Sequence, residues 1–261
     1  MTEEKAGAKM GGRGGASGFP ANGPTGGPIG PQSAAETKDL HELAEYMKGV
    51  GQWGIVLDEQ SLSGATFENV RGAAAAVERI MTEFPQAQAN FHELRGEALK
   101  HGVLANASYN GVIRLGEYYF AKTEGDLSYT YDKTTNGGFH PAGTNKDHIA
   151  SHEAGHILER ALIDKYILSQ GNGYYTRLEA SQAWNKSKLS GKVVSEACRA
   201  AKKTPGGKGL TNADLIRGVS GYATKNKSET LAECVADYAA NGSNAKPLSV
   251  AVWNILKREL G

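Results

Sequence analysis

The sequence is poor in several features that would place it in a class at once. It contains only two cysteines among 261 residues, so we do not expect a disulfide framework. Basic and acidic side chains nearly balance at a net charge of +1, which argues against nucleic acid or a membrane surface as a charge-driven partner. No apolar run is long enough for a membrane span, and the N-terminus lacks the apolar stretch of a signal peptide. We therefore expect a cytoplasmic or virion-associated protein.

Large hydrophobic side chains are scarce in residues 1–36, a segment rich in Gly, Ala, Pro, Ser and Thr. Such a segment cannot bury enough apolar surface to offset the entropy that ordering would cost. We predict a disordered tail over residues 1–36 and one domain over residues 37–261. The tail could connect the domain to a phage or delivery partner.

The most informative segment that is present is the pentapeptide His152-Glu153-Ala154-Gly155-His156. Positions four apart on a helix lie on one face, about 5–6 Å from each other, so His152 and His156 could bind one Zn²⁺. Glu153 would lie beside a metal-bound water and could take its proton as the hydroxide attacks a carbonyl. The spacing therefore predicts a catalytic zinc site.

The surrounding residues predict that this motif lies on a helix. Residues 144–147 offer a capping start, and apolar side chains recur at near-helical spacing as far as about Leu168. Gly155 costs about 1 kcal/mol relative to alanine within a helix. That cost is explicable if another backbone or a ligand approaches Gly155 closely.

Two histidines and a water leave a tetrahedral zinc ion one protein ligand short. The best source of a third ligand is the segment 221–238, where Glu229, Glu233 and Asp237 recur every four residues on a predicted helix. Carboxylates stacked in this way repel each other unless a cation or a donor lies between them. A metal at the first carboxylate, and a hydrogen bond from a histidine ligand to the second, would remove the conflict.

These residues resemble the anthrax lethal factor-like peptidase domain, a gluzincin family that includes the Pro-Pro endopeptidases. The resemblance rests on the pentapeptide and on a group of matching positions around the third ligand: Tyr222, Asn226, Glu229, Ala232 and Glu233. The family carries a tyrosine seven residues before its glutamate ligand and a second glutamate four residues after it. The matches lie between about Ile113 and Tyr238, concentrated in two short windows.

The resemblance implies an α+β, zincin-like metallopeptidase domain with a small mixed sheet, an active-site helix and a helical C-terminal part. It implies that Glu229 is the third zinc ligand beside the two histidines, and that Tyr222 donates a hydrogen bond to the oxyanion of the tetrahedral intermediate. It further implies that Glu233 orients a ligand. The segment 138–144 is similar to the lead-in of peptidase-like domains in phage head-associated proteins.

We therefore predict a zinc-dependent endopeptidase that acts on a protein or peptide substrate, with Glu153 as general base. Two alternatives remain open. The chain could be a phage head-associated structural protein that keeps the fold as an interaction module. It could also be an effector toxin that a partner delivers through the tail.

The rest of the chain predicts an α+β domain. We expect helices near residues 35–49, 67–84, 177–187, 193–203 and 247–260, and strands near residues 53–57, 102–105, 111–120 and 127–131. The strand at 112–119 could pair with substrate at a sheet edge, or be internal. Arg114 could bind a substrate carboxylate or be structural. His148 shares the helical face of His152, where it could modulate the site or be a partly buried, hydrogen-bonded residue.

Overall fold

The computed structural model describes residues 30–49, 54–171 and 173–261, and the elements below all lie in the compact unit Pro31–Gly261. Most of the predicted tail, residues 1–29, lies outside the described residues. The end of the predicted tail, Ala34–Glu36, forms a short 3-10 helix (η1). Ala34 is buried, and its N–H donates to the Glu78 carboxylate at 2.9 Å.

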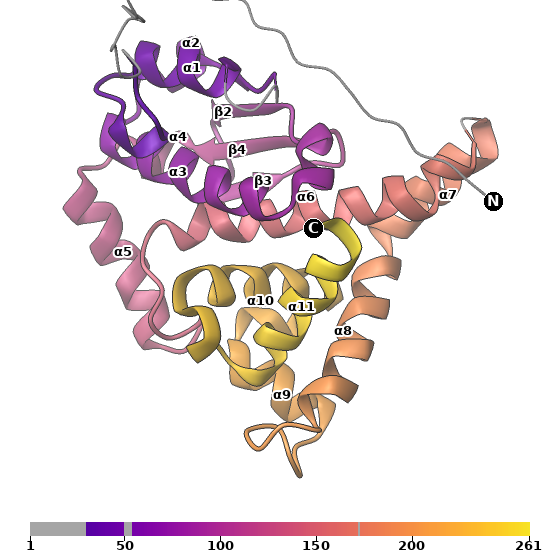
Figure 1. The fold of residues 1–261 in the computed structure, drawn as a ribbon. Helices are drawn as coiled ribbons and strands as arrows, with labels where there is room; N and C mark the ends of the chain where they lie inside the picture. Colours follow the sequence, from indigo (N-terminus) through magenta and orange to yellow (C-terminus); the bar gives the residue numbers. More distant parts are fainter. Residues whose placement is uncertain (1–29, 50–53, 172) are drawn as a thin grey trace, which may run out of the picture. The chain divides into compact units, whose positions relative to one another are not determined.

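The N-terminal half contains a small sheet and the helices beside it (Figure 1). Its elements are α1 (Leu40–Gly49), β1 (Val56–Leu57), α2 (Glu59–Leu62), α3 (Phe67–Glu83), η3 (Pro85–Asn90), β2 (Glu93–Glu97), β3 (Ala105–Ala107), β4 (Val112–Gly116), α4 (Glu117–Phe120) and α5 (Glu124–Asn136). The predicted helices near 35–49 and 67–84 are confirmed as α1 and α3. The predicted strand 53–57 is confirmed at β1, while Trp53 lies outside the described residues.

The predicted strand at 127–131 is wrong, because these residues belong to α5. Thr123 caps this helix by accepting a hydrogen bond from Asp126 N. Leu127 and Tyr131 are four residues apart, so a helix places both on one face, where both are buried. The same side chains also fit a strand with alternating exposure, but the N-cap at Thr123 favours the helix.

The four strands form a mixed sheet in the order β1-β2-β4-β3. The pairs β1/β2 and β2/β4 are parallel, and β3 pairs with β4 antiparallel. Because β4 lies between β2 and β3, it is internal, and β3 is the edge strand. The predicted strand at 111–120 is confirmed only over β4, as an internal strand, because residues 117–120 form α4. The predicted strand at 102–105 overlaps β3 only at Ala105.

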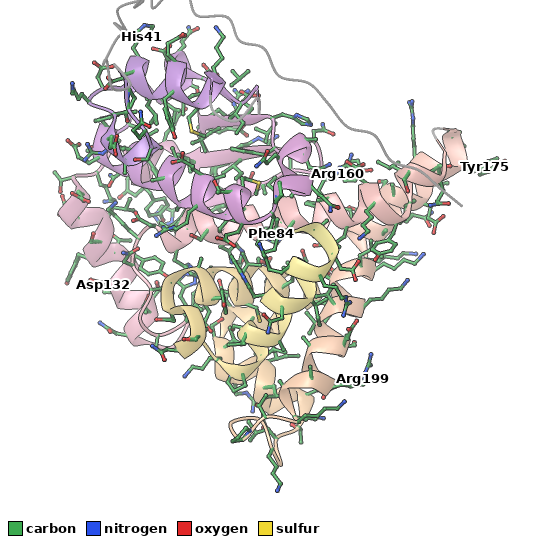
Figure 2. All side chains as sticks on the ribbon, in the orientation of Figure 1. His41, Phe84, Asp132, Arg160, Tyr175 and Arg199 are labelled. Carbon is green, nitrogen blue, oxygen red and sulfur yellow. The ribbon has the colours of Figure 1, made fainter. Side chains whose placement is uncertain are left out.

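The C-terminal half is helical, so the described residues have a mixed α+β fold with a small sheet (Figure 1). Its elements are α6 (His148–Tyr166), η4 (Leu168–Gln170), α7 (Tyr174–Asn185), α8 (Lys188–Ala201), α9 (Asn212–Val219), η5 (Tyr222–Thr224), α10 (Lys227–Asn241), η6 (Gly242–Asn244) and α11 (Pro247–Leu260). The helix with the pentapeptide, the C-terminal helix and the two helices near 177–187 and 193–203 are confirmed, whereas α9 was not predicted. Tyr175, near the start of α7, is 83% exposed (Figure 2). Among the described helices, none is long and apolar enough to cross a membrane.

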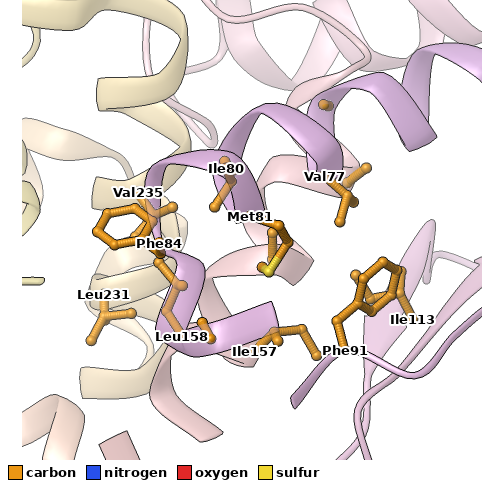
Figure 3. Close-up of a cluster of buried hydrophobic side chains, with 14 of the residues drawn as sticks. Val77, Ile80, Met81, Phe84, Phe91, Ile113, Ile157, Leu158, Leu231 and Val235 are labelled. Carbon is orange, nitrogen blue, oxygen red and sulfur yellow. The ribbon is translucent and has the colours of Figure 1, made fainter. Parts of the chain in front are cut away.

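Helix α6 lies between the sheet and α10 and contacts both layers (Figure 1). The buried side chains that join these layers come from α3, α6, α10, β4 and the two residues that flank η3 (Figure 3): Val77, Ile80, Met81, Phe84, Phe91, Ile113, Ile157, Leu158, Leu231 and Val235. The core thus holds α6 on two sides, which fixes the direction of the side chains on its remaining face.

The crossing of α6 and α10 explains the glycine in the pentapeptide. A Cβ atom added at Gly155 would lie 2.6 Å from Ala232 Cα, far closer than van der Waals contact. The expectation that another backbone approaches Gly155 is therefore confirmed. Asn226 caps α10 by accepting a hydrogen bond from Glu229 N at 2.9 Å. The close crossing and the cap bring the first two turns of α10 against the histidine face of α6.

Candidate metal centre

Three predicted ligands meet at this crossing, and we call His152, His156 and Glu229 the groove triad. Glu229 Oε2 lies 3.0 Å from His152 Nε2 and 3.4 Å from His156 Nε2. Donors at about 2.0–2.1 Å from a tetrahedral zinc ion are about 3.3 Å from each other. The ligand atoms of the groove triad therefore have the spacing that one metal ion requires, and the structure contains a His/Glu group that could hold a metal ion.

The far side of each histidine ring is held by a hydrogen bond that assigns its tautomer. Ser228 Oγ donates its only hydroxyl proton to Glu159 Oε2. The Ser228 hydroxyl must therefore accept the hydrogen bond from His156 Nδ1, at 3.0 Å. Glu233 Oε1 accepts from His152 Nδ1 at 2.8 Å. Protonation at Nδ1 leaves the Nε2 lone pairs of the neutral rings directed toward Glu229. The network thus presents two nitrogen donors to one point.

Ser228 and Glu159 were not predicted as site residues. Glu159 follows His156 by three residues and His152 by seven, so the helical period places it on the ligand face of α6. It is fully buried, and such a glutamate on an otherwise apolar turn was the available clue. Ser228 directly precedes the predicted ligand Glu229.

The three carboxylates spaced along α10 have different environments. Glu233 is fully buried, with Oε2 accepting from Ser220 Oγ at 2.7 Å. Asp237 accepts from Asn241 Nδ2 at 2.7 Å and from Lys246 N at 3.0 Å, away from the histidines. The repulsion expected from the sequence is relieved because each carboxylate has its own donors.

The buried charges of the centre shift each other's pKa values. Burial disfavours the imidazolium of His152, but hydrogen bonds to Glu229 and Glu233 outweigh this and raise its pKa well above the usual value. Burial likewise works to raise the pKa of Glu229, and its hydrogen bonds with the two histidines hold that pKa well below the usual range. For Glu233, too, the surrounding imidazoles outweigh burial and lower the pKa. In the metal-free centre a proton on His152 therefore takes the place of a cation.

Glu153 differs from these carboxylates because no cation holds it ionised. It is buried, and this burial raises its pKa, although the nearby imidazoles of His152 and His156 oppose the shift. The backbone of Ala107, on the edge strand β3, also works to lower this pKa. A raised pKa brings a carboxylate closer to the value that suits a general base near neutral pH.

Tyr222 stands at the open side of the groove triad. Its hydroxyl lies 3.4 Å from Glu229 Oε1, and Lys225 Nζ donates to both the hydroxyl and Oε1, at 3.0 and 3.1 Å. Backbone hydrogen bonds from Gly221 N to Gly138 O and from Tyr222 N to Phe139 O attach η5 to the segment before α6. The segment 138–144 thus positions the tyrosine. Lys225 was not predicted, although its place four residues before Glu229 puts it within reach.

Two cavities meet at these residues. The larger, of about 430 Å³, extends along the edge strand and the start of α10, with Trp184 and Ser187 on its other side. The smaller, of about 150 Å³, extends from residues 102–105 to Phe139, His140 and His148. Both are lined by His152, Glu153 and Tyr222. A ligand that filled both cavities would therefore pass directly across Glu153 and Tyr222.

Two further candidates from the sequence lie elsewhere than at the groove triad. Arg114 bonds to Glu97 Oε2 at 2.8 Å and to Asn106 Oδ1 at 3.1 Å, so its structural interpretation holds. His148 was expected to be partly buried and hydrogen-bonded, yet it is only 3% exposed and neither ring nitrogen has a hydrogen-bond partner. Burial lowers the pKa of His148 to about 3, so this ring is neutral.

The site is thus a His₂Glu group that could hold a metal ion at a helix crossing, with a buried carboxylate and a phenol beside it. Comparison of the chain with protein-family models, with curated proteins and with solved structures finds no match. What the site does must therefore be argued from its own geometry.

Proposed function

We propose that this chain is a zinc-dependent endopeptidase, with the groove triad as its zinc ligands. The observation that supports this most is the approach of two imidazole Nε2 atoms to one carboxylate oxygen, at 3.0 and 3.4 Å, in a group whose ligand atoms all lie within 4.8 Å of one another. Two nitrogens, one oxygen and an open fourth position are the ligand set of catalytic zinc sites in peptidases. The open side faces the larger cavity, where substrate would have access.

A zinc ion in this position would act as a Lewis acid for a water molecule and for the scissile carbonyl. Glu153 accepts the proton of the attacking water as the new C–O bond forms, and passes it to the amine nitrogen as the C–N bond breaks. The tetrahedral intermediate carries a negative oxygen, toward which Tyr222 donates its hydroxyl hydrogen. Lys225, within hydrogen-bond distance of that hydroxyl, adds positive charge on the same side.

We further propose that the substrate binds as an extended peptide beside β3. The edge strand pairs on one side with β4, and its other side borders both cavities. Unpaired backbone groups of an edge strand can pair with a peptide, which gives affinity with little dependence on sequence. Because Ala107 and Glu153 line the same cavity, the same strand would lie beside both the peptide and the base. The strand next to the active site is then β3 rather than the predicted 112–119.

The test is the variant Glu153→Gln, assayed for zinc content by elemental mass spectrometry and for cleavage of a peptide library. We expect wild-type cleavage to be sensitive to chelators. The variant should retain its zinc while turnover falls by about 10²–10⁴-fold, the usual contribution of a general base. Glu117→Gln, an exposed carboxylate outside the site, is the control that should change neither quantity. Undiminished cleavage by Glu153→Gln would exclude Glu153 as the base.

Zinc binding at the groove triad without cleavage of any peptide would instead favour the alternatives. In a phage head-associated structural protein, the metal would serve stability alone. An effector toxin would need its delivery partner or a particular target protein before cleavage appeared.

A further inference from the structure

A second group of two histidines and a glutamate lies next to the groove triad, on the other side of the His152 ring. We call His140, His148 and Glu233 the inner triad. We propose that the inner triad is a second metal-binding site, for a divalent transition metal ion such as Zn²⁺. Its ligand atoms all lie within 4.8 Å of one another. The proposal does not depend on peptidase activity, because it uses different nitrogen atoms from those of the groove triad.

The first support is a set of buried nitrogens without partners. Among the described residues, three buried imidazole nitrogens lack a hydrogen bond, namely His140 Nδ1 and both nitrogens of His148. A buried polar atom left in this state costs about 1–3 kcal/mol. All three atoms belong to one cluster, and His148 is 3% exposed, so bulk solvent does not satisfy them. A metal ion bound between the rings would give His140 and His148 a partner each.

The second support is spacing. Glu233 Oε1 lies 3.5 Å from His140 Nδ1 and 3.4 Å from His148 Nε2. These distances are long for hydrogen bonds, but they match the separation of about 3.3 Å between ligands of a tetrahedral zinc ion. The contact from the same oxygen to His152 Nδ1 is 2.8 Å, a hydrogen-bond length. Glu233 thus holds one ring by hydrogen bonding and stands at ligand distance from the other two.

The carboxylate of Glu233 has capacity for both roles. Its Oε2 accepts from Ser220 Oγ, and one lone pair of Oε1 accepts from His152. The second lone pair of Oε1 remains for a metal ion. A fourth ligand could be water, since the cavity of about 150 Å³ borders both His140 and His148 and provides room and an entry path.

The packing around the inner triad fixes its two imidazole rings. The ring of Tyr131 stacks on His140 with centroids 5.0 Å apart at 10°, and lies 5.5 Å from the ring of His148. Tyr131 is itself buried and bonded to Thr144 Oγ1 at 2.7 Å. Since ring positions set by packing do not have to be ordered on binding, the inner triad is prepared for a metal ion.

The two sites would be neighbours without sharing a ligand. His152 turns Nε2 toward Glu229 and Nδ1 toward Glu233, so its ring separates the two metal positions. Paired catalytic metals, about 3.5–4 Å apart, share bridging ligands instead. We infer that the second ion stabilises the packing of the 138–144 segment against α6 and α10, and takes no direct part in bond cleavage.

The experiment measures metal equivalents per chain after stripping the full-length protein with a chelator, reloading with Zn²⁺ and removing excess metal. We expect two equivalents in the wild type and one in His140→Ala/His148→Ala. The variant His156→Ala/Glu229→Ala should also bind one, because it removes the groove triad while keeping the bond from His152 to Glu233. His92→Ala, an exposed histidine outside both triads, should bind two.

Cobalt provides a second measurement that does not depend on activity. Co²⁺ loaded into His156→Ala/Glu229→Ala should show the visible absorption of a low-coordinate site, and the further change His140→Ala should abolish it. His140 is only partly buried and precedes α6, so its loss tests the site even if the buried His148→Ala variant fails to fold.

The outcomes separate the two sites. One equivalent in the wild type that disappears in His156→Ala/Glu229→Ala would overturn the inner site and leave the proposed zinc peptidase intact. One equivalent that disappears only in His140→Ala/His148→Ala would support the inner site and overturn zinc binding by the groove triad. Two equivalents that persist in His140→Ala/His148→Ala would also overturn the inner site.

Discussion

The groove triad and the inner triad use the same residue types, but their surroundings differ, and His140 of the inner triad lies in the loop before α6. In the groove triad every imidazole has a hydrogen bond at Nδ1, and both Nε2 atoms face one carboxylate. In the inner triad the buried imidazoles lack hydrogen bonds, and aromatic rings surround them. Glu153 and Tyr222 line the cavities at both triads, whereas Lys225 lines only the larger cavity, beside the groove triad.

This difference indicates that ligand residues alone do not decide what a metal site can do. Hydrogen bonds hold both imidazole rings of the groove triad, and all three of its residues line the larger cavity, of about 430 Å³. The inner triad would gain its missing contacts from the metal itself. We therefore assign chemistry to the first and stabilisation to the second.

The largest effect should come from Glu229→Ala, which removes a direct ligand from the groove triad only. Because loss of a supporting partner already costs about 10–100-fold in metal affinity, loss of the ligand itself should cost more than about 100-fold. Zinc titration with a competing chromophoric chelator would measure this. Asp237→Asn, the carboxylate two turns further along α10, should leave the affinity unchanged. A weak effect of Glu229→Ala would shift attention to another third ligand.

The ligands of the groove triad could be predicted from the sequence because their positions follow from helical periods. The motif fixes two of them, and the four-residue spacing of carboxylates on α10 points to Glu229 and Glu233. Ser228 and Lys225 could not be assigned in the same way, because their roles depend on how closely α10 approaches α6. That approach is a matter of tertiary packing, and Gly155 was the one residue in the sequence that indicated it.

The inner triad illustrates the same limit in a stronger form. His140 lies in a loop, and its position next to α6 depends on the ring of Tyr131 and on backbone bonds to η5. The contact between Tyr131 and His140 could not be predicted, because residues 127–131 were predicted to be a strand and not part of the helix α5. Elements with long periodic patterns, such as α11, could be placed from the sequence within a residue, whereas loop contacts could not.

Gly155→Ala should disturb both triads together. The new methyl group would meet the α10 backbone at Ala232, so the helices must separate, and overpacking of this kind costs typically about 1–3 kcal/mol of stability. Glu229 and Glu233 would both move away from their histidines. Urea unfolding and metal equivalents per chain would be measured on the variant. Gly125→Ala, on α5 with open space at the Cβ position, is the matched control.

If Gly155→Ala lowered zinc binding at one triad and left the other unchanged, the expectation that both triads depend on the same helix crossing would be wrong. Such a result would mean that α10 pivots about one of its glutamates rather than moving as a rigid element. Unchanged stability and metal binding would contradict the close crossing itself.

Ser228→Ala should weaken the groove triad alone, by about 10–100-fold in zinc affinity. The variant removes the acceptor for His156 Nδ1 and leaves the Glu159 carboxylate buried with neither oxygen bonded. The ring can then rotate, and its tautomer is no longer fixed. Ser228→Thr keeps the hydroxyl and should restore most of the affinity. Competitive zinc titration of the three proteins would test the role of this hydroxyl, and equal affinities would exclude it.

The smallest expected effect is the change in zinc affinity per pH unit, and the two triads should differ in it. The raised pKa of His152 means that zinc must displace a proton from the groove triad, so zinc affinity there should rise by up to about tenfold per pH unit below that pKa. His148, with its pKa lowered to about 3, holds no proton near neutrality, so it adds no such dependence to the inner triad. Calorimetric titration of each single-site variant in two buffers of different ionisation enthalpy would count the protons released.

The metal-free protein should show the opposite trend in stability. Because the folded pKa of His152 lies above its unfolded value of about 6.5, its stabilising contribution is complete below pH 6.5 and is lost as the pH rises through the folded pKa. Glu229 and Glu233 have lowered pKa values, so their contributions are present above about pH 4.5 and are lost as the pH falls. The lowered pKa of His148 destabilises the fold as the pH falls below its unfolded value of about 6.5. Thermal unfolding of chelator-treated protein should therefore give the highest stability near pH 6.5. A melting temperature that rose steadily from pH 6.5 to 9 would contradict a protonated His152 between the two glutamates.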